Sequence, residues 1–106
     1  MKIVVVKPFK KPYITEIDGS LKSMQSVVRG YIEIVYPFSS NPEIALVCNE
    51  EGKLNDLTPN RYLYNSNLGI YDCICGDFFL CLAPPESENL QSLTDELADK
   101  LVRKFS

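Results

Sequence analysis

The sequence predicts an α+β domain with a single mixed or antiparallel sheet of about five strands, two main helices and one short helical turn. Short runs rich in β-branched and aromatic residues alternate with Pro, Gly and Asn, which is typical of strands joined by turns. Two other segments carry apolar residues at helical spacing. At 106 residues with 45% hydrophobic composition, residues 1–106 are expected to form one domain.

The first four strands are predicted to form two hairpins. Lys2 to Lys7 is a continuous β-branched run, as expected for a strand buried on both faces, and Pro8 ends it. Tyr13 to Ile17 alternates between two faces and follows after a short turn. Tyr31 to Tyr36 and Glu43 to Cys48 repeat this arrangement with a longer loop between them.

Both main helices are expected to pack an apolar stripe on the sheet. The first begins after Asp18-Gly19-Ser20, where a side-chain oxygen can accept free backbone N–H groups. Its apolar residues are Leu21, Met24, Val27 and Val28. The second begins near Ser92 or Thr94. Its stripe recurs every four residues, at Leu93, Leu97, Leu101 and Phe105. A dimer contact is the alternative use of this second stripe.

The segment between the two helices contains the remaining elements. Thr58-Pro59 suits a helix start, because a hydroxyl can cap the first turn and Pro is favoured at the first helical position. Asn60 to Tyr64 is therefore predicted to form the short helical turn. Ile70 to Leu82 alternates again and is predicted to be one long bent strand or two short ones, since Gly76 interrupts it.

The charge balance disfavours a duplex nucleic-acid partner. The chain has 11 basic and 14 acidic side chains, a net charge of −3, and no long basic run that could follow a phosphate backbone. No apolar run approaches the roughly 20 residues of a membrane span, and the first residues lack a signal-peptide pattern. We therefore expect a cytoplasmic protein without a membrane partner.

The residue inventory excludes several kinds of catalysis. Histidine is absent, which removes Ser-His and Cys-His arrangements and His-metal sites. No glycine-rich phosphate loop occurs, so no nucleotide cofactor is expected. Glu50 and Glu51 are adjacent on a predicted turn and point in different directions. We expect no catalytic residues and no cofactor, and the alternative is a small enzyme that uses thiols or carboxylates.

The four cysteines are predicted to be reduced thiols in the core. A Cys₄ zinc site normally uses two close pairs with about two residues between the partners. Here the only close pair has one intervening residue, and no metal site is expected. The cysteines are Cys48, Cys73, Cys75 and Cys81.

Arg61 is the residue best suited to hold an anion, because its guanidinium offers a rigid fork of donors. At the start of a helical turn it would lie beside free backbone N–H groups, which also favour anions. The alternative is an ion pair with Asp56, Asp72 or Asp77 that pins the loop to the sheet. The sequence leaves both roles open.

Several blocks together resemble a known family. They are Lys10-Lys-Pro-Tyr13, Gly30-Tyr-Ile-Glu-x-Val-Tyr-Pro-Phe38, Cys48-Asn-Glu-Glu-Gly-Lys-Leu54, Asn60-Arg61-x-Leu63 and Tyr71-Asp-x-Ile-x-Gly-x-Phe78. The family is the uncharacterised bacterial and phage family catalogued as domain of unknown function thirty-eight forty-six. The resemblance covers nearly the whole chain. It implies a setting on phages, plasmids or conjugative elements and carries no established activity.

We therefore predict a noncatalytic binding protein of phage or mobile-element type, whose partner is a host protein or an element-encoded protein. The contact region is expected at Asn60, Arg61, Tyr71, Asp72 and Asp77. The alternative is a binder of a small anionic, nucleotide-like ligand held by the Asn60-Arg61 loop. The sequence leaves a homo-oligomer open.

Overall fold

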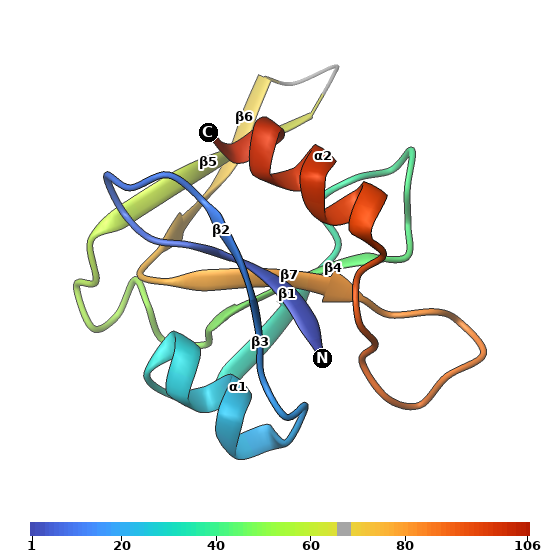
Figure 1. Cartoon of the computed structure of the whole chain (residues 1–106). Coiled ribbons are helices and arrows are strands. Elements are labelled where there is room, and N and C mark those ends of the chain that lie inside the picture. Colours follow the sequence, from blue (N-terminus) through green and yellow to red (C-terminus); the bar gives the residue numbers. More distant parts are fainter. Residues whose placement is uncertain (66–68) are drawn as a thin grey trace.

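A computed structural model of the chain describes residues 1–65 and 69–106. Their secondary structure consists of seven strands and two helices, which confirms the α+β class and both main helices (Figure 1). The elements are β1 (Lys2–Val6), β2 (Tyr13–Glu16), α1 (Leu21–Val28), β3 (Ile32–Val35), β4 (Ile44–Asn49), β5 (Pro59–Asn65), β6 (Gly69–Cys75), β7 (Phe78–Leu82) and α2 (Asp95–Phe105). Within these described residues, no helix is both long and apolar enough to cross a membrane.

Five strands form the central sheet, in the order β2-β1-β7-β4-β3. The two predicted hairpins are confirmed, because β1 pairs with β2 and β3 pairs with β4. Strand β7 lies between β1 and β4 and joins the hairpins. Every pairing is antiparallel, so the antiparallel alternative of the prediction is the one found.

The two helices cover opposite faces of this sheet (Figure 1). Successive side chains of a strand point to opposite faces, so a strand between two helices must be apolar throughout. The α2 face is built largely from Val4, Val6, Ile44, Leu46, Phe78 and Leu80. The α1 face is built from Ile3, Val5, Ala45, Val47, Phe79 and Cys81. This alternation explains why β1, β4 and β7 read as continuous apolar runs.

Side-chain caps fix where the helices start. The Ser20 hydroxyl accepts from the Ser23 N–H at 3.1 Å, and the Thr94 hydroxyl accepts from the Leu97 N–H at 3.2 Å. Of the two predicted caps for α2, Thr94 is therefore the one used. The Ser92 hydroxyl instead accepts from the Lys2 N–H at 2.8 Å, which ties the approach to α2 to the first strand.

The short helical turn predicted over Asn60 to Tyr64 is wrong, and so is the expectation of a single sheet. These residues belong to β5, which pairs with β6 in a separate two-stranded antiparallel sheet, here called the ribbon. Pro59 is compatible with either structure, because Pro is tolerated at the first residue of a strand as well as of a helix. In the structure, buried Leu63 lies between exposed Tyr62 and Tyr64, which is the alternation of a half-buried strand.

The ribbon packs beside the C-terminal end of α2. Leu63 and Ile74 are buried in the same core cluster as Leu101 and Phe105 of α2, and Figure 1 shows the ribbon and this end of α2 at the same end of the molecule. The break expected at Gly76 separates two short strands, β6 and β7, that belong to different sheets. Gly76 has a φ of +83°, which suits glycine, and the chain passes from ribbon to central sheet there.

Candidate functional site

Two clefts flank the ribbon. The first, called the aromatic cleft, has a volume of about 350 Å³ and is lined by Pro37, Phe38, Asn60, Arg61, Tyr62, Leu63, Tyr64, Lys104, Phe105 and Ser106. The second, called the thiol cleft, has a volume of about 390 Å³ and is lined by Glu33, Cys48, Asn49, Glu50, Gly52, Lys53, Leu54, Asp72, Cys73, Ile74 and Cys75. Asn60 and Arg61 lie at the first cleft, and Asp72 lies at the second.

Asn60 joins three separate parts of the chain. Its side-chain amide donates to the Val6 carbonyl at 2.9 Å and to the Gly76 carbonyl at 2.8 Å. Its side-chain oxygen accepts from Arg61 Nη1 at 2.9 Å. Both halves of the amide are therefore used, and β5 is held against the end of β1 and the turn between β6 and β7.

Arg61 fastens β5 to the end of α2. Its Nε and Nη2 donate to the Phe105 carbonyl at 3.1 and 3.0 Å, and Nη2 also donates to the Lys10 carbonyl at 3.0 Å. Its Nη1 donates to the backbone and side-chain oxygens of Asn60 at 3.0 and 2.9 Å. Carbonyls of the last helical turn lack partners within the helix, and a cation is favoured there.

This arrangement uses all five N–H donors of the guanidinium within the chain. Of the two roles the sequence left open, the geometry favours the internal one. The acceptors are backbone carbonyls and Asn60, whereas the expected ion pair with Asp56, Asp72 or Asp77 is not among those formed by the described residues. An anion at Arg61 would have to displace one of these hydrogen bonds.

Exposed aromatic rings give the aromatic cleft its character. Tyr62 and Tyr64 are 54% and 66% exposed, respectively. Lys104 Nζ lies 5.0 Å from the centroid of the Phe38 ring, and the Phe38 and Phe105 rings are 6.2 Å apart. The cleft therefore combines accessible rings with an accessible ammonium, on a wall that Asn60 and Arg61 hold in place.

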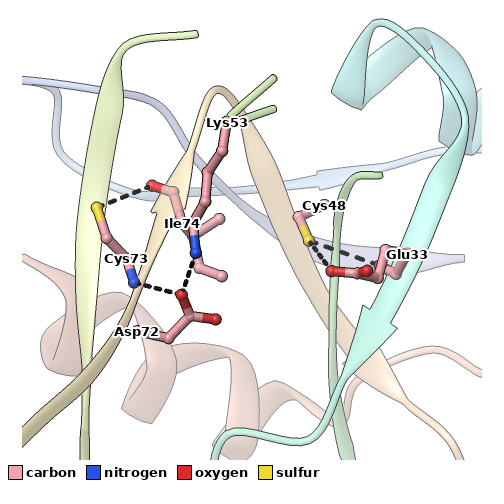
Figure 2. A network of polar contacts seen from close by, with 6 residues as sticks. All are labelled: Glu33, Cys48, Lys53, Asp72, Cys73 and Ile74. Atoms are coloured by element: carbon pink, nitrogen blue, oxygen red, sulfur yellow. Dashed lines mark hydrogen bonds and ion pairs between the residues drawn. The ribbon is translucent and has the colours of Figure 1, made fainter. Parts of the chain in front are cut away.

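Three cysteines, Cys48, Cys73 and Cys75, line the thiol cleft, and Figure 2 shows the polar contacts of the first two. The Cys48 sulfur points toward Glu33 and lies 3.7 Å from its backbone carbonyl oxygen. Asp72 accepts from Lys53 Nζ at 2.5 Å and from the Cys73 N–H at 2.7 Å, and Lys53 thereby holds the pKa of that carboxyl below its usual range. The side chains of Cys73 and Cys75 are half-buried.

Burial keeps the core thiols protonated. Desolvation, with a smaller contribution from the negative charge of Glu33, raises the pKa of Cys48 to about 11. Desolvation alone raises the pKa of Cys81 to about 12. The pKa of Cys75 is also raised, by burial and by neighbouring Cys73. Since the thiolate is the reactive and metal-binding form, these cysteines are poor nucleophiles at neutral pH. The described residues contain no group of three or more Cys, Asp or Glu side chains that could hold a metal ion.

The predicted contact residues are therefore divided between different places. Asp77 is half-buried in the turn between β6 and β7. Tyr71 lies in β6, and its side chain is outside the part of the chain that the structure describes. Sequence reasoning passed over Tyr62 and Tyr64 as contact residues. Their Tyr-x-Tyr spacing would have placed both rings on one face of a strand, had the segment been predicted as a strand.

Comparison with protein families identifies the chain more closely than its geometry does. The family model "Domain of unknown function (DUF3846)" matches residues 1–106, the whole chain. The chain belongs to this family. The resemblance noted in the sequence blocks is thereby confirmed, and the family description supplies no activity. Searches of the curated proteins and of the solved structures found no match.

Proposed function

We propose that the protein is a noncatalytic binding module that contacts another protein, encoded by a host or by a phage or mobile element, through the aromatic cleft. The observation that carries this proposal is the pair of tyrosines, Tyr62 and Tyr64, which stand more than half exposed beside a cleft. Tyrosine is enriched at protein interfaces, because its ring provides a large contact area and loses little rotamer entropy.

The framework beneath the tyrosines supports the same proposal. Asn60 and Arg61 tie β5 to β1, to the loop at Lys10 and to the end of α2. A surface that is already ordered in the free protein loses less conformational entropy on binding, and its affinity is correspondingly higher. The polar residues of this segment thus support the contact surface from behind.

The state of the cysteines favours binding over catalysis. All four are free, and burial keeps Cys48 and Cys81 protonated well above neutral pH. A reducing cytoplasm, where we place the interaction, would maintain free thiols. The thiol-dependent enzyme remains the weaker alternative, since a nucleophilic cysteine requires a lowered pKa.

The nucleotide-like ligand remains a second alternative with less support, because Arg61 has no N–H donor to spare. Thermal unfolding in the presence of a panel of nucleotides tests it directly. A ligand that binds only the folded protein raises the melting temperature. No shift is expected with any member of the panel, and a concentration-dependent shift that disappears in Arg61→Lys would favour the ligand.

Affinity capture with matched variants tests the proposed contact surface. The Tyr62→Ser/Tyr64→Ser variant changes the cleft, whereas Tyr13→Ser/Tyr31→Ser changes exposed tyrosines that line neither cleft. From a host lysate, we expect the unaltered protein and the control to retain the same protein, and the cleft variant to retain at least about tenfold less. Equal retention by both variants, or no specific capture, would contradict the proposal.

A further inference from the structure

We infer that the aromatic cleft receives an acidic segment of a partner protein that also carries an apolar side chain. The inference rests on the proposed binding function and names the chemistry of the partner. It begins from a second hollow, of about 170 Å³, that runs along α2. This hollow and the aromatic cleft are neighbours that share Phe38 and Lys104 as lining residues, and the two together are here called the groove.

The charged side chains that line this groove are all basic. Lys100 and Lys104 are one helical turn apart and both line it, and Arg61 adds a third positive charge at one end. None of the residues that line the two hollows in the described structure is Asp or Glu, although the chain carries 14 acidic side chains and a net charge of −3. A basic groove on an acidic protein attracts carboxylates, whereas the acidic remainder of the surface repels them.

Part of the lining of the second hollow is aliphatic, namely Ile44, Leu97 and Leu101. Ile44 and Leu101 are almost fully buried, at 4% and 3% exposed, so the partly buried Leu97 presents most of the aliphatic surface. Such a surface can cover an aliphatic or aromatic side chain of a bound peptide. The combination of this apolar surface and flanking ammonium groups therefore matches a segment that alternates apolar and acidic residues.

A single-stranded nucleic acid would also carry negative charge, but it fits this groove less well. Such strands are held by stacking successive bases on aromatic faces along a basic track. Here the second hollow has Phe38 as the single aromatic residue of its lining, beside the aliphatic Ile44, Leu97 and Leu101, so aromatic faces do not continue along the groove. The guanidinium that would clamp a phosphate already donates all its hydrogen bonds within the chain. We therefore assign the groove to an acidic peptide segment.

Titration of the isotope-labelled protein with a fluorescent peptide tests this assignment. The probe is a twelve-residue peptide of Glu, Leu and Phe, and its partner probe carries Lys in place of each Glu. We expect the acidic peptide to shift amide resonances around Phe38, Tyr62 and Lys104, and the basic peptide to leave them unchanged. Raising the salt concentration should weaken the binding, because surface charges are screened.

Charge-reversal variants localise the effect. Lys104→Glu should weaken the acidic peptide at least about tenfold, since it places a carboxylate beside the bound carboxylates. Lys22→Glu changes the net charge equally on the exposed side of α1 and should bind as the unaltered protein does. Absent binding, or equal binding to Lys104→Glu, would overturn the inference. The proposed function would still stand if capture from lysate depended on Tyr62 and Tyr64.

Three other occupants can be distinguished in the same preparation. Tighter binding of oligothymidylate than of the acidic peptide would assign the groove to a nucleic acid, and tighter binding of anionic phospholipid vesicles would assign it to a membrane surface. Concentration-dependent dimerisation that Lys104→Glu abolishes would assign the groove to a second copy of this chain. Each of these results overturns the acidic-peptide assignment.

Discussion

The two clefts differ in where their polar groups are directed. In the aromatic cleft, the strongest hydrogen-bonding side chains, Asn60 and Arg61, turn inward and are satisfied by the chain itself, which leaves tyrosine rings and lysines at the surface. In the thiol cleft, the chemically conspicuous Cys48 is buried and protonated, and Lys53 and Asp72 neutralise each other. In both clefts, the residues that most suggest chemistry stabilise the fold.

Removing the Arg61 side chain should produce the largest loss of stability. This loss would show that Arg61 supports the fold and is not part of the contact surface. Arg61→Ala deletes five hydrogen bonds and leaves the carbonyls of Lys10 and Phe105 without their side-chain donor. The free energy of unfolding should therefore fall by about 2–4 kcal/mol. Urea denaturation measures the change. Arg61→Lys should restore only a small part of the loss, because an ammonium cannot reproduce the planar fork.

The exposed tyrosines should contribute less to stability than Arg61 does. Tyr62→Ser/Tyr64→Ser should destabilise the protein by less than Arg61→Ala, because both rings are more than half exposed. If Arg61→Ala were as stable as the unaltered protein, the internal role of Arg61 would be contradicted, and the guanidinium would again be a candidate ligand contact.

Alkaline pH should act next most strongly, through the thiol cleft. The pKa of Cys48 is raised in the folded protein to about 11 from an ordinary value near 9. Its contribution to stability is therefore full below the unfolded pKa and is lost as pH rises toward the folded pKa. Between pH 9 and 11 the loss approaches about 1.4 kcal/mol per pH unit.

Comparison with Cys48→Ala isolates this contribution from the other groups that titrate at alkaline pH. The variant should have a lower stability at pH 7 but a shallower decline between pH 9 and 11 when urea denaturation is repeated across that range. Parallel declines in the two proteins would show that Cys48 ionises as freely in the folded chain as in the unfolded chain.

The Lys53–Asp72 pair should have the smallest effect. Lys53 is 64% exposed in its side chain, and exposed ion pairs contribute little to stability. In Lys53→Ala the pKa of Asp72 should rise toward its ordinary value, which carboxyl resonances measured by NMR titration would report. Because a lowered carboxyl pKa stabilises the fold above the unfolded pKa, Lys53→Ala should lose a small, constant amount of stability at neutral pH, and its difference from the unaltered protein should vanish as the pH falls through the folded pKa of Asp72. A large loss at pH 7 would contradict this reading.

The sequence predicted the central sheet better than the ribbon for a physical reason. Strands β1, β4 and β7 lie between two helices and are buried on both faces, so each has a continuous apolar sequence. The ribbon buries only one face, and its first residues, Thr58-Pro59, suit a helix start as well as a strand start. Leu63 alone between two exposed tyrosines was too weak a pattern to decide between them.

The candidate site was predictable in its residues but not in their roles. Asn60 and Arg61 could be singled out by type, yet two of the three residues that accept from Arg61 lie 44 and 51 residues away in the chain. The spacing of residues in the sequence does not predict which distant carbonyl lies beside a given donor in the folded chain. Lys104 and Phe38 escaped notice for the same reason, because only the folded chain places them beside the ribbon.

The hydrogen bonds around Asn60 and Arg61 constrain substitution very unequally. Apart from the bond between the two side chains, their acceptors are main-chain carbonyl oxygens: Val6, Lys10, Asn60, Gly76 and Phe105. Any amino acid offers such an oxygen, so these bonds place no requirement on the side chain of an accepting residue. The two donors have no equivalent freedom. Over time the loop at Lys10 could change its sequence completely while the junction it helps to form stays the same.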